Sequence, residues 1–150
     1  MNTRLPWHPL VVLAAVLAAA SSLSATGARV AEGEALVSVH VTGLERDEGS
    51  VRIAVFDGPE GFTEEPHLAV VVSPTDLSAE WTVRLPYGVY AVAVVHDADD
   101  NGRLNTNLLG MPRERYGFSN DARGTFGPPS FEDASVVVAE PSVRIPVNVR

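Results

Sequence analysis

Residues 80–97 read EWTVRLPYGVYAVAVVHD and contain two predicted strands with a turn between them. Along residues 80–85, polar and apolar side chains alternate, which is the period-two pattern of a strand with one buried face. Residues 86–88, Pro-Tyr-Gly, suit a type I turn with proline second and glycine fourth. Residues 89–95 are apolar at every position. We therefore expect them to form a central strand that is covered on both faces.

Strand patterns continue on both sides of this hairpin. They cover residues 37–42, 51–55, 68–73, 135–139 and 143–149. This makes seven strands, and no helical periodicity follows residue 28. The pattern predicts an all-β fold, namely an antiparallel seven-stranded β-sandwich of immunoglobulin-like or transthyretin-like type with one long ordered loop. Pro146 cannot donate a hydrogen bond to a neighbouring strand, so we expect the last strand at a sheet edge.

The charge and cysteine content argue against several classes of function. Nineteen acidic residues and 11 basic ones give a formal net charge of −8. We expect no nucleic-acid partner, because such binding begins with basic side chains that neutralise phosphates. The chain has no cysteine, which excludes disulfides, thiolate metal sites and cysteine nucleophiles.

The first 28 residues have the composition of a secretory signal peptide. One charged residue, Arg4, precedes the apolar run LVVLAAVLAAA at residues 10–20, and small residues follow the run. This run is too short for a membrane-spanning helix, which needs about 20 apolar residues. We expect a signal peptide over residues 1–28 and a single β-sandwich domain, without a membrane span, over residues 29–150. An exported domain without cysteine is typical of a bacterial periplasmic or secreted protein.

The segment between the strands that end at residue 96 and begin at residue 135 is unusually long. Connections of this length are uncommon in a compact domain and are generally functional or disordered. We expect residues 97–134 to be ordered, because they contain four aromatic side chains: Tyr116, Phe118, Phe126 and Phe131. These aromatics predict a small core of the loop itself that caps the sandwich. The alternative is an aromatic surface that binds a sugar or a peptide.

The start of this loop, HDADDNGRLNTN at residues 96–107, has the spacing of a calcium-binding loop. Oxygen-bearing side chains at alternate positions surround one point when a glycine, here Gly102, permits a sharp turn. Two carboxylates about 4 Å apart repel by about 4 kcal/mol near a protein surface, and a bound divalent cation reverses that penalty. The predicted calcium ligands are the side chains of Asp97, Asp99 and Asn101, the backbone carbonyl of Arg103, and Asn105 directly or through water.

The match to a calcium loop has one gap. The twelfth position, which normally holds a bidentate glutamate, is Leu108. Another acidic residue would have to complete the site, and the sequence does not rank the four candidates: Glu114, Asp121, Glu132 and Asp133. The alternative is a turn cluster without an ion, in which Asp and Asn side chains bond the backbone.

Three functional hypotheses follow from these residues, and the third, a purely structural domain, predicts neither a pocket nor an ion. The first is a non-enzymatic module, organised by calcium, that binds a protein or a glycan at the cell envelope. The second is a small hydrolase or isomerase on a transthyretin-like sandwich, with His96 and Asp97 as the acid–base pair. The enzyme hypothesis predicts a deep pocket lined by His96.

Several motifs in this chain also resemble those of a bacterial exported family, domain of unknown function 2141. They are VRIAVFDGPEGF at residues 51–62, followed by the H-D-x-D-x-N-G, T-N-x-x-G-x-P, G-F-S-N and P-P-S-F-E-D-A motifs within residues 85–134. The resemblance spans roughly residues 35–149. It implies a periplasmic or secreted β-sandwich and no established activity. Members of this family often carry aspartate at the position of Asn105, which predicts weaker ion binding in this chain.

Overall fold

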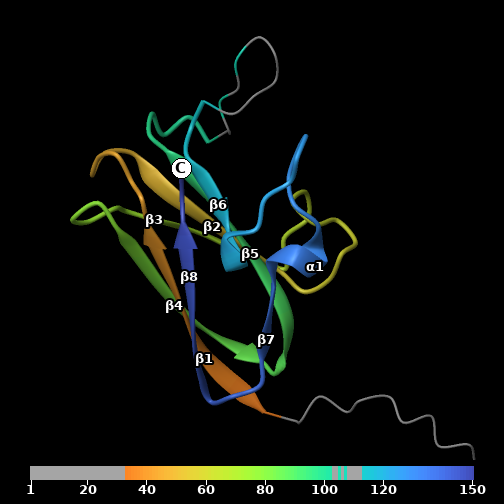
Figure 1. Cartoon of the computed structure of the whole chain (residues 1–150). Helices are drawn as coiled ribbons and strands as arrows, with labels where there is room; N and C mark the ends of the chain where they lie inside the picture. Colours follow the sequence, from red (N-terminus) through yellow and green to blue (C-terminus); the bar gives the residue numbers. More distant parts are fainter. Residues whose placement is uncertain (1–32, 103–104, 106, 108–112) are drawn as a thin grey trace, which may run out of the picture.

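The computed structural model describes residues 33–102, 105, 107 and 113–150 (Figure 1). The strands are β1 (Glu34–Thr42), β2 (Ser50–Phe56), β3 (Leu68–Val72), β4 (Ala79–Pro86), β5 (Gly88–Asp97), β6 (Tyr116–Phe118), β7 (Ser135–Val138) and β8 (Ser142–Asn148). Two short helical turns, η1 (Ser119–Asp121) and α1 (Phe131–Ala134), lie between β6 and β7. The predicted signal peptide, residues 1–28, lies outside the described residues. Within them, no helix is long and apolar enough to cross a membrane.

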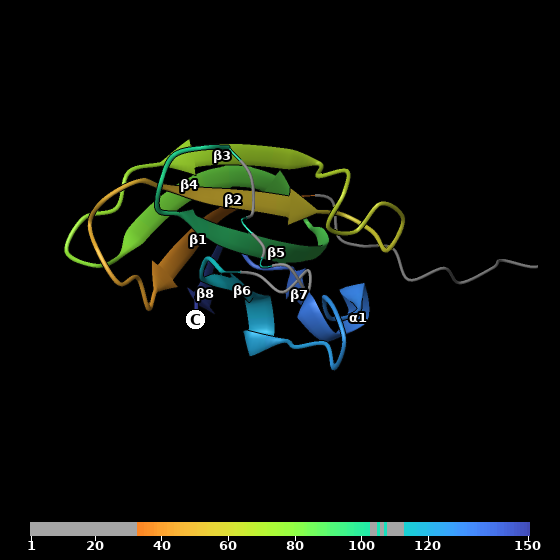
Figure 2. The same ribbon diagram turned by 90° about the horizontal axis from the view of Figure 1, so that it is seen from above.

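The strands form two sheets. Strands β4, β1 and β8 form the smaller sheet, in that order. The larger sheet has the order β3-β2-β5-β6, and β7 also pairs with β5. Figures 1 and 2 show that α1 lies next to β7, and Figure 1 shows that the loop after β5 leaves at the same end of the molecule as the C-terminus. The all-β, sandwich-like fold predicted from the strand pattern is confirmed.

Two details of the predicted architecture are wrong. The described chain has eight strands rather than seven, because β6 lies within the segment that we expected to be a loop. This strand has three residues, Tyr-Gly-Phe, which is too short for an alternating pattern to be visible. The sheets are also not purely antiparallel, since β8 pairs in parallel with β1. Alternation shows which face of a strand is buried but does not identify its neighbours.

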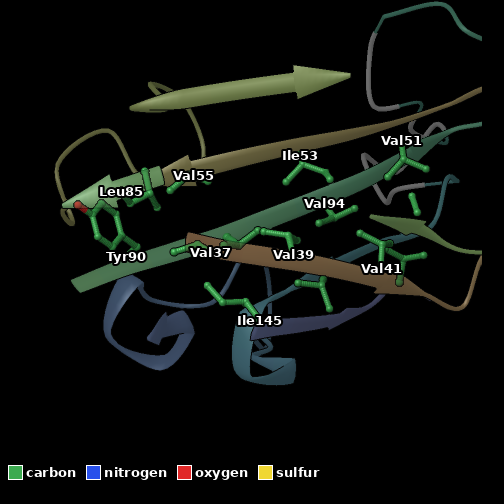
Figure 3. Packing of buried hydrophobic residues seen from close by; sticks show 14 of the residues in the cluster. Val37, Val39, Val41, Val51, Ile53, Val55, Leu85, Tyr90, Val94 and Ile145 are labelled. Carbon is green, nitrogen blue, oxygen red and sulfur yellow. The ribbon is translucent and has the colours of Figure 1, made fainter. Parts of the chain in front are cut away.

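The main core lies between the two sheets. Alternate residues of β1, including Val37, Val39 and Val41, face Ile53 of β2 and Val94 of β5 (Figure 3). Each of these side chains is at most 1% exposed. The alternation read from the sequence therefore identified the inner faces of β1 and β2 correctly.

A second apolar cluster covers the outer face of the larger sheet. It combines Phe56 and Ala91 of the sheet with Phe118, Phe131 and Ala134, which lie in or after β6. Alternate residues of β5 belong to the two clusters, so the prediction of a central strand covered on both faces is confirmed. The loop aromatics Phe118 and Phe131 thus pack on part of the outer face of the larger sheet.

Phe126 does not belong to this cluster. Its side chain is 101% exposed, between Gly124 and Gly127, so the expectation that all four loop aromatics pack together is wrong at this position. Tyr116 is also partly exposed, although its ring lies 6.2 Å from that of Phe118. The aromatic count indicated an ordered segment but did not identify which rings are buried.

Two contacts fix β6 at the seam between the sheets. The backbone N–H of Tyr116 donates to the carbonyl of Arg150, and the N–H of Arg150 donates to the carbonyl of Tyr116. The buried Ser119 hydroxyl, immediately after β6, accepts a hydrogen bond from the N–H of Val92 at 2.9 Å. Strand β8, with Pro146, lies at the end of the smaller sheet among the described strands, which confirms the predicted edge position.

Candidate metal site

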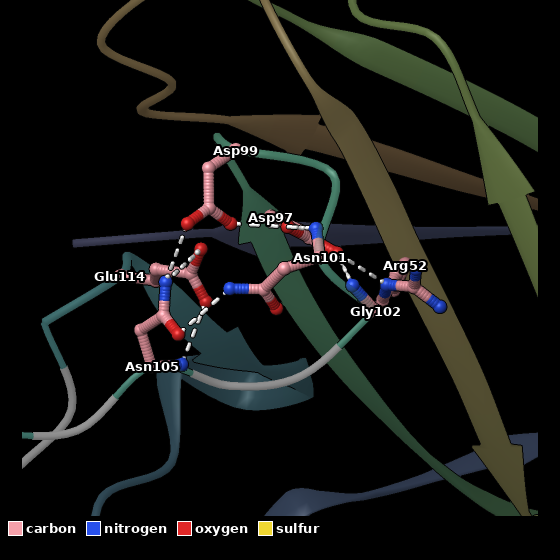
Figure 4. A network of polar contacts seen from close by, with 7 residues as sticks. All are labelled: Arg52, Asp97, Asp99, Asn101, Gly102, Asn105 and Glu114. Atoms are coloured by element: carbon pink, nitrogen blue, oxygen red, sulfur yellow. Dashed lines mark hydrogen bonds and ion pairs between the residues drawn. The ribbon is translucent and has the colours of Figure 1, made fainter.

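Asp97 is the last residue of β5 and is completely buried. Its Oδ2 accepts a hydrogen bond from Nε of Arg52 at 2.9 Å and from the backbone N–H of Gly102 at 2.8 Å (Figure 4). Its Oδ1 accepts from the backbone N–H of Asn101 at 3.1 Å. The carboxylate therefore closes a tight turn over residues 97–102 and also pairs with a cation on β2.

The turn has the backbone conformation that the sequence pattern requires. Gly102 has φ +80°, in the left-handed region that glycine adopts without strain. Asp100 also lies in this region, at φ +54°, where aspartate is tolerated better than most side chains. Gly102 is the sixth residue counted from Asp97, which is the position of the glycine in calcium-binding loops. The predicted sharp turn is present.

Asp99, Asn105 and Glu114 face one another beside this turn (Figure 4). Nδ2 of Asn105 donates to Oδ2 of Asp99 at 3.0 Å and to Oε1 of Glu114 at 3.5 Å. The backbone N–H of Asn105 donates to Oε2 of Glu114 at 2.9 Å, and Nδ2 of Asn101 donates to Oδ1 of Asn105 at 2.8 Å. N–H groups therefore lie between the carboxylates and satisfy part of their hydrogen-bonding capacity.

Three carboxylates converge at this point. One ligand oxygen from each of Asp97, Asp99 and Glu114 lies within 4.8 Å of the other two. Of the predicted ligands, the structure also brings Asn101 and Asn105 here, whereas Arg103 lies outside the described residues.

Glu114 is the only one of the four candidate completing acids that the structure brings to the loop. Asp121 pairs with Arg150 and Arg123 next to η1. Glu132 and Asp133 lie in α1, where Asp133 accepts a hydrogen bond from the Ser130 hydroxyl.

Strand pairing explains the position of Glu114. Tyr116 of β6 pairs with Val95 of β5, and the N–H of His96 donates to the carbonyl of Arg115 at 2.9 Å. Continuing this antiparallel register by one residue places Glu114 opposite Asp97. The sequence could not reveal this, because β6 itself was too short to recognise.

Hydrogen bonding keeps Asp97 ionised in spite of its burial. Burial raises the pKa of the Asp97 carboxyl, but the Arg52 guanidinium and the N–H groups of Gly102 and Asn101 outweigh this effect. The net pKa lies below the ordinary value for aspartate. The site therefore presents a buried negative charge at neutral pH.

A neighbouring loop, residues 43–49, contacts Arg115, the residue that follows Glu114. Arg115 donates to the carbonyl of Gly43 at 3.2 Å and forms an ion pair with Glu45. The hydrogen bond from Arg115 holds the pKa of the Glu45 carboxyl below its usual value. Because Arg115 follows Glu114 directly, these contacts also restrain the position of Glu114.

The geometry does not favour His96 and Asp97 as an acid–base pair. Consecutive side chains of a strand point to opposite faces, so the two side chains point apart. His96 is 3% exposed, and its Nε2 lies 2.9 Å from the carbonyl oxygen of Glu48. His96 is not among the residues that line the cavity beside Asp99 and Glu114 or the cavity beside Tyr116 and Asp121. Neither of these two cavities provides the His96-lined pocket that the enzyme hypothesis predicts.

An open cavity lies on the solvent side of the carboxylates. Its volume is about 380 Å³, and it is lined by Ala98, Asp99, Asn105, Arg113 and Glu114. A cation held by these carboxylates would therefore be accessible to a dissolved ligand.

Comparison with known proteins places the chain among bacterial proteins. Residues 39–146 match the model of a family described as uncharacterised proteins conserved in bacteria, domain of unknown function 2141 (DUF2141). The chain belongs to this family. The match covers most of the two sheets of this DUF2141 protein and the whole candidate site, and it carries no assigned activity. No curated protein and no solved structure matches the chain.

Proposed function

We propose that this DUF2141 protein is an exported β-sandwich module whose loop between β5 and β6 binds calcium, and that it binds a protein or a glycan at the bacterial cell envelope. The observation that carries the proposal is the convergence of the carboxylates of Asp97, Asp99 and Glu114 within 4.8 Å. Export is supported by the composition of residues 1–28, which is that of a signal peptide.

The donor set suits calcium in chemical terms. Calcium takes six to eight oxygen ligands in flexible geometry. Each of the three carboxylates offers one ligand oxygen, the amide oxygens of Asn101 and Asn105 add two more, and water would complete the coordination. At present both amides donate through Nδ2. Rotating each amide group by half a turn exchanges nitrogen for oxygen and converts a donor into a ligand.

Other common metals fit the site less well. Zinc prefers cysteine and histidine ligands, and the chain has no cysteine, while His96 points away from the carboxylates. Magnesium requires near-octahedral geometry and retains several water molecules, so a site rich in carboxylate oxygens favours calcium.

The proposed binding role rests on the open cavity next to the carboxylates. A calcium ion there would offer a coordination position to ligand hydroxyl or carboxylate groups. The exposed Arg113 side chain lines the same cavity and adds a donor for anionic ligands. Protein and glycan surfaces both present such groups.

Calorimetric titration tests the calcium proposal. The purified protein, freed of metals with EDTA and dialysed, is titrated with CaCl₂ and separately with MgCl₂. We expect one saturable calcium site and a higher melting temperature in calcium than in magnesium. An absence of heat, together with an unchanged melting temperature in excess calcium, would rule out the proposal.

A further inference from the structure

Ser50 carries a buried hydroxyl that lacks a partner. It is the first residue of β2 and is 9% exposed. Its Oγ is buried and makes no hydrogen bond to any group in the described part of the chain. Burying a hydroxyl without a partner is unfavourable, so such a group in a native protein calls for an explanation.

Ser50 stands next to the candidate metal site. It pairs directly with Asp97 across β2 and β5. Paired residues of adjacent strands lie on the same face of a sheet, with Cβ atoms about 5 Å apart. Because the extended register of β6 places Glu114 on the other side of Asp97, the three residues form one row across β2, β5 and the segment that precedes β6.

Asp97 does not satisfy this hydroxyl. Its carboxylate accepts from Arg52, Gly102 and Asn101 instead. Ser50 is therefore paired with a residue whose carboxylate is buried, and its hydroxyl oxygen has no hydrogen-bond partner among the described residues. A hydroxyl oxygen is a neutral hard ligand of the kind that calcium accepts.

We propose that the hydroxyl oxygen of Ser50 is an additional ligand of the cation bound at Asp97, at the buried end of the site. This inference rests on the proposed calcium function. It extends the site from the loop to β2, and it explains the buried hydroxyl without invoking any other partner. Binding of the ion would satisfy the hydroxyl, and a neutral ligand adds no charge to a site that already holds three carboxylates.

Two pairs of variants test this role in the full-length protein. Ser50→Ala removes the oxygen. Ser38→Ala is the matched control, since Ser38 of β1 bonds Thr82 of β4 and both residues lie in the smaller sheet, away from the site. We expect Ser50→Ala to bind calcium about tenfold more weakly than wild type in calorimetric titration, and Ser38→Ala to bind as wild type does. In EDTA, Ser50→Ala should melt at or above the wild-type temperature, because its unpartnered hydroxyl is gone.

Cysteine variants give a second readout that a purely structural serine would not change. The chain has no cysteine of its own, so Ser50→Cys introduces the only thiol. A thiolate prefers soft cations, and we expect Ser50→Cys to bind Cd²⁺ at least tenfold more tightly than the control Ser38→Cys.

The outcomes separate this inference from the calcium proposal. If wild type binds calcium and Ser50→Ala binds it within twofold, the Ser50 role is wrong and the calcium site stands. A Cd²⁺ affinity no greater for Ser50→Cys than for Ser38→Cys, or a lower melting temperature of Ser50→Ala in EDTA, also overturns the role of Ser50. If wild type binds no calcium, the proposed function fails, and this inference fails with it.

Discussion

Asp97 has two roles that substitutions can separate, because it supports the turn and also belongs to the proposed ion site. Its carboxylate is completely buried and pairs with Arg52, whereas the nearby Asp99 is exposed. The sequence pattern put both residues in the same class of calcium ligand. It could not show that one of them is also part of the fold, since burial depends on which strands surround it.

We expect Asp97→Asn to destabilise the protein by about 2 kcal/mol in EDTA, because it leaves Arg52 without its partner carboxylate. This value is below that of a fully buried pair, since the Arg52 side chain is 38% exposed. Urea denaturation in EDTA measures the effect. Asp99→Asn is the matched control and should change stability by less than about 0.5 kcal/mol while still weakening calcium binding. Equal stability losses in the two variants would contradict a structural role for Asp97.

The raised pKa of Tyr90 predicts that the free energy of unfolding falls at alkaline pH. Its ring is buried in the main core, and its hydroxyl donates to the carbonyl of Pro86 at 3.0 Å. Burial raises the pKa of this hydroxyl above its ordinary value of 10.0, and the Asp57 carboxylate acts in the same direction. The folded protein thus holds this proton more tightly than the unfolded chain. The resulting stabilisation is complete below about pH 10 and is lost as the pH rises through the folded pKa.

Tyr90→Phe removes this titration. We expect the variant to be about 1 kcal/mol less stable than wild type at pH 7, because it lacks one hydrogen bond. The difference should shrink above pH 10, where wild type loses stability and the variant does not lose this contribution. Urea denaturation at a series of pH values measures both curves. Parallel curves from pH 7 to pH 11 would show that Tyr90 is not responsible for the loss of stability at alkaline pH.

At the scale of elements, β6 is the segment that the sequence did not reveal. Longer strands were recognisable because alternation or an apolar run over several residues is a repeated signal, whereas β6 has three residues with glycine in the middle. Its position depends on contacts with β5 and with the end of β8, which are distant in sequence. The same reason explains why Glu114 could not be ranked above the other three acids.

Gly117 in β6 permits a close approach to the end of β8. A Cβ atom at this position would lie 2.5 Å from the backbone oxygen of Asn148. We expect Gly117→Ala to destabilise the protein by about 1–3 kcal/mol, because backbone must move to make room. Gly127→Ala is the control, since a Cβ atom there would meet no atom within 4 Å. Thermal melts compare the two variants, and an equal effect of both would contradict the close contact at β6.

At the scale of the whole molecule, the fold class followed from local patterns, whereas the assembly of the site did not. Alternation predicted two-layer packing, and the completely apolar run in β5 predicted its central position. The site combines the end of β5, the following turn and Glu114, which lies two residues before β6. Only the turn is local in sequence, and it is the part that the spacing of Asp97, Asp99 and Asn101 predicted.

Calcium is expected to stabilise the whole domain. Because the ion would link the end of β5 to Glu114, two residues before β6, binding should favour the folded state over the unfolded chain. A ligand at 100 times its dissociation constant contributes about 2.7 kcal/mol of stability. Urea denaturation in EDTA and in excess calcium measures this difference. A free energy of unfolding that is equal in both conditions would show that the ion does not bind the folded state preferentially.

The central claim is that carboxylates from two separate segments hold one cation, and Glu114 tests it most directly. Calorimetric calcium titration of Glu114→Gln is compared with that of Glu132→Gln, an acid on α1 that the structure places away from the loop. We predict at least a tenfold loss of affinity for Glu114→Gln and wild-type affinity for Glu132→Gln. Wild-type affinity in Glu114→Gln would contradict the claim.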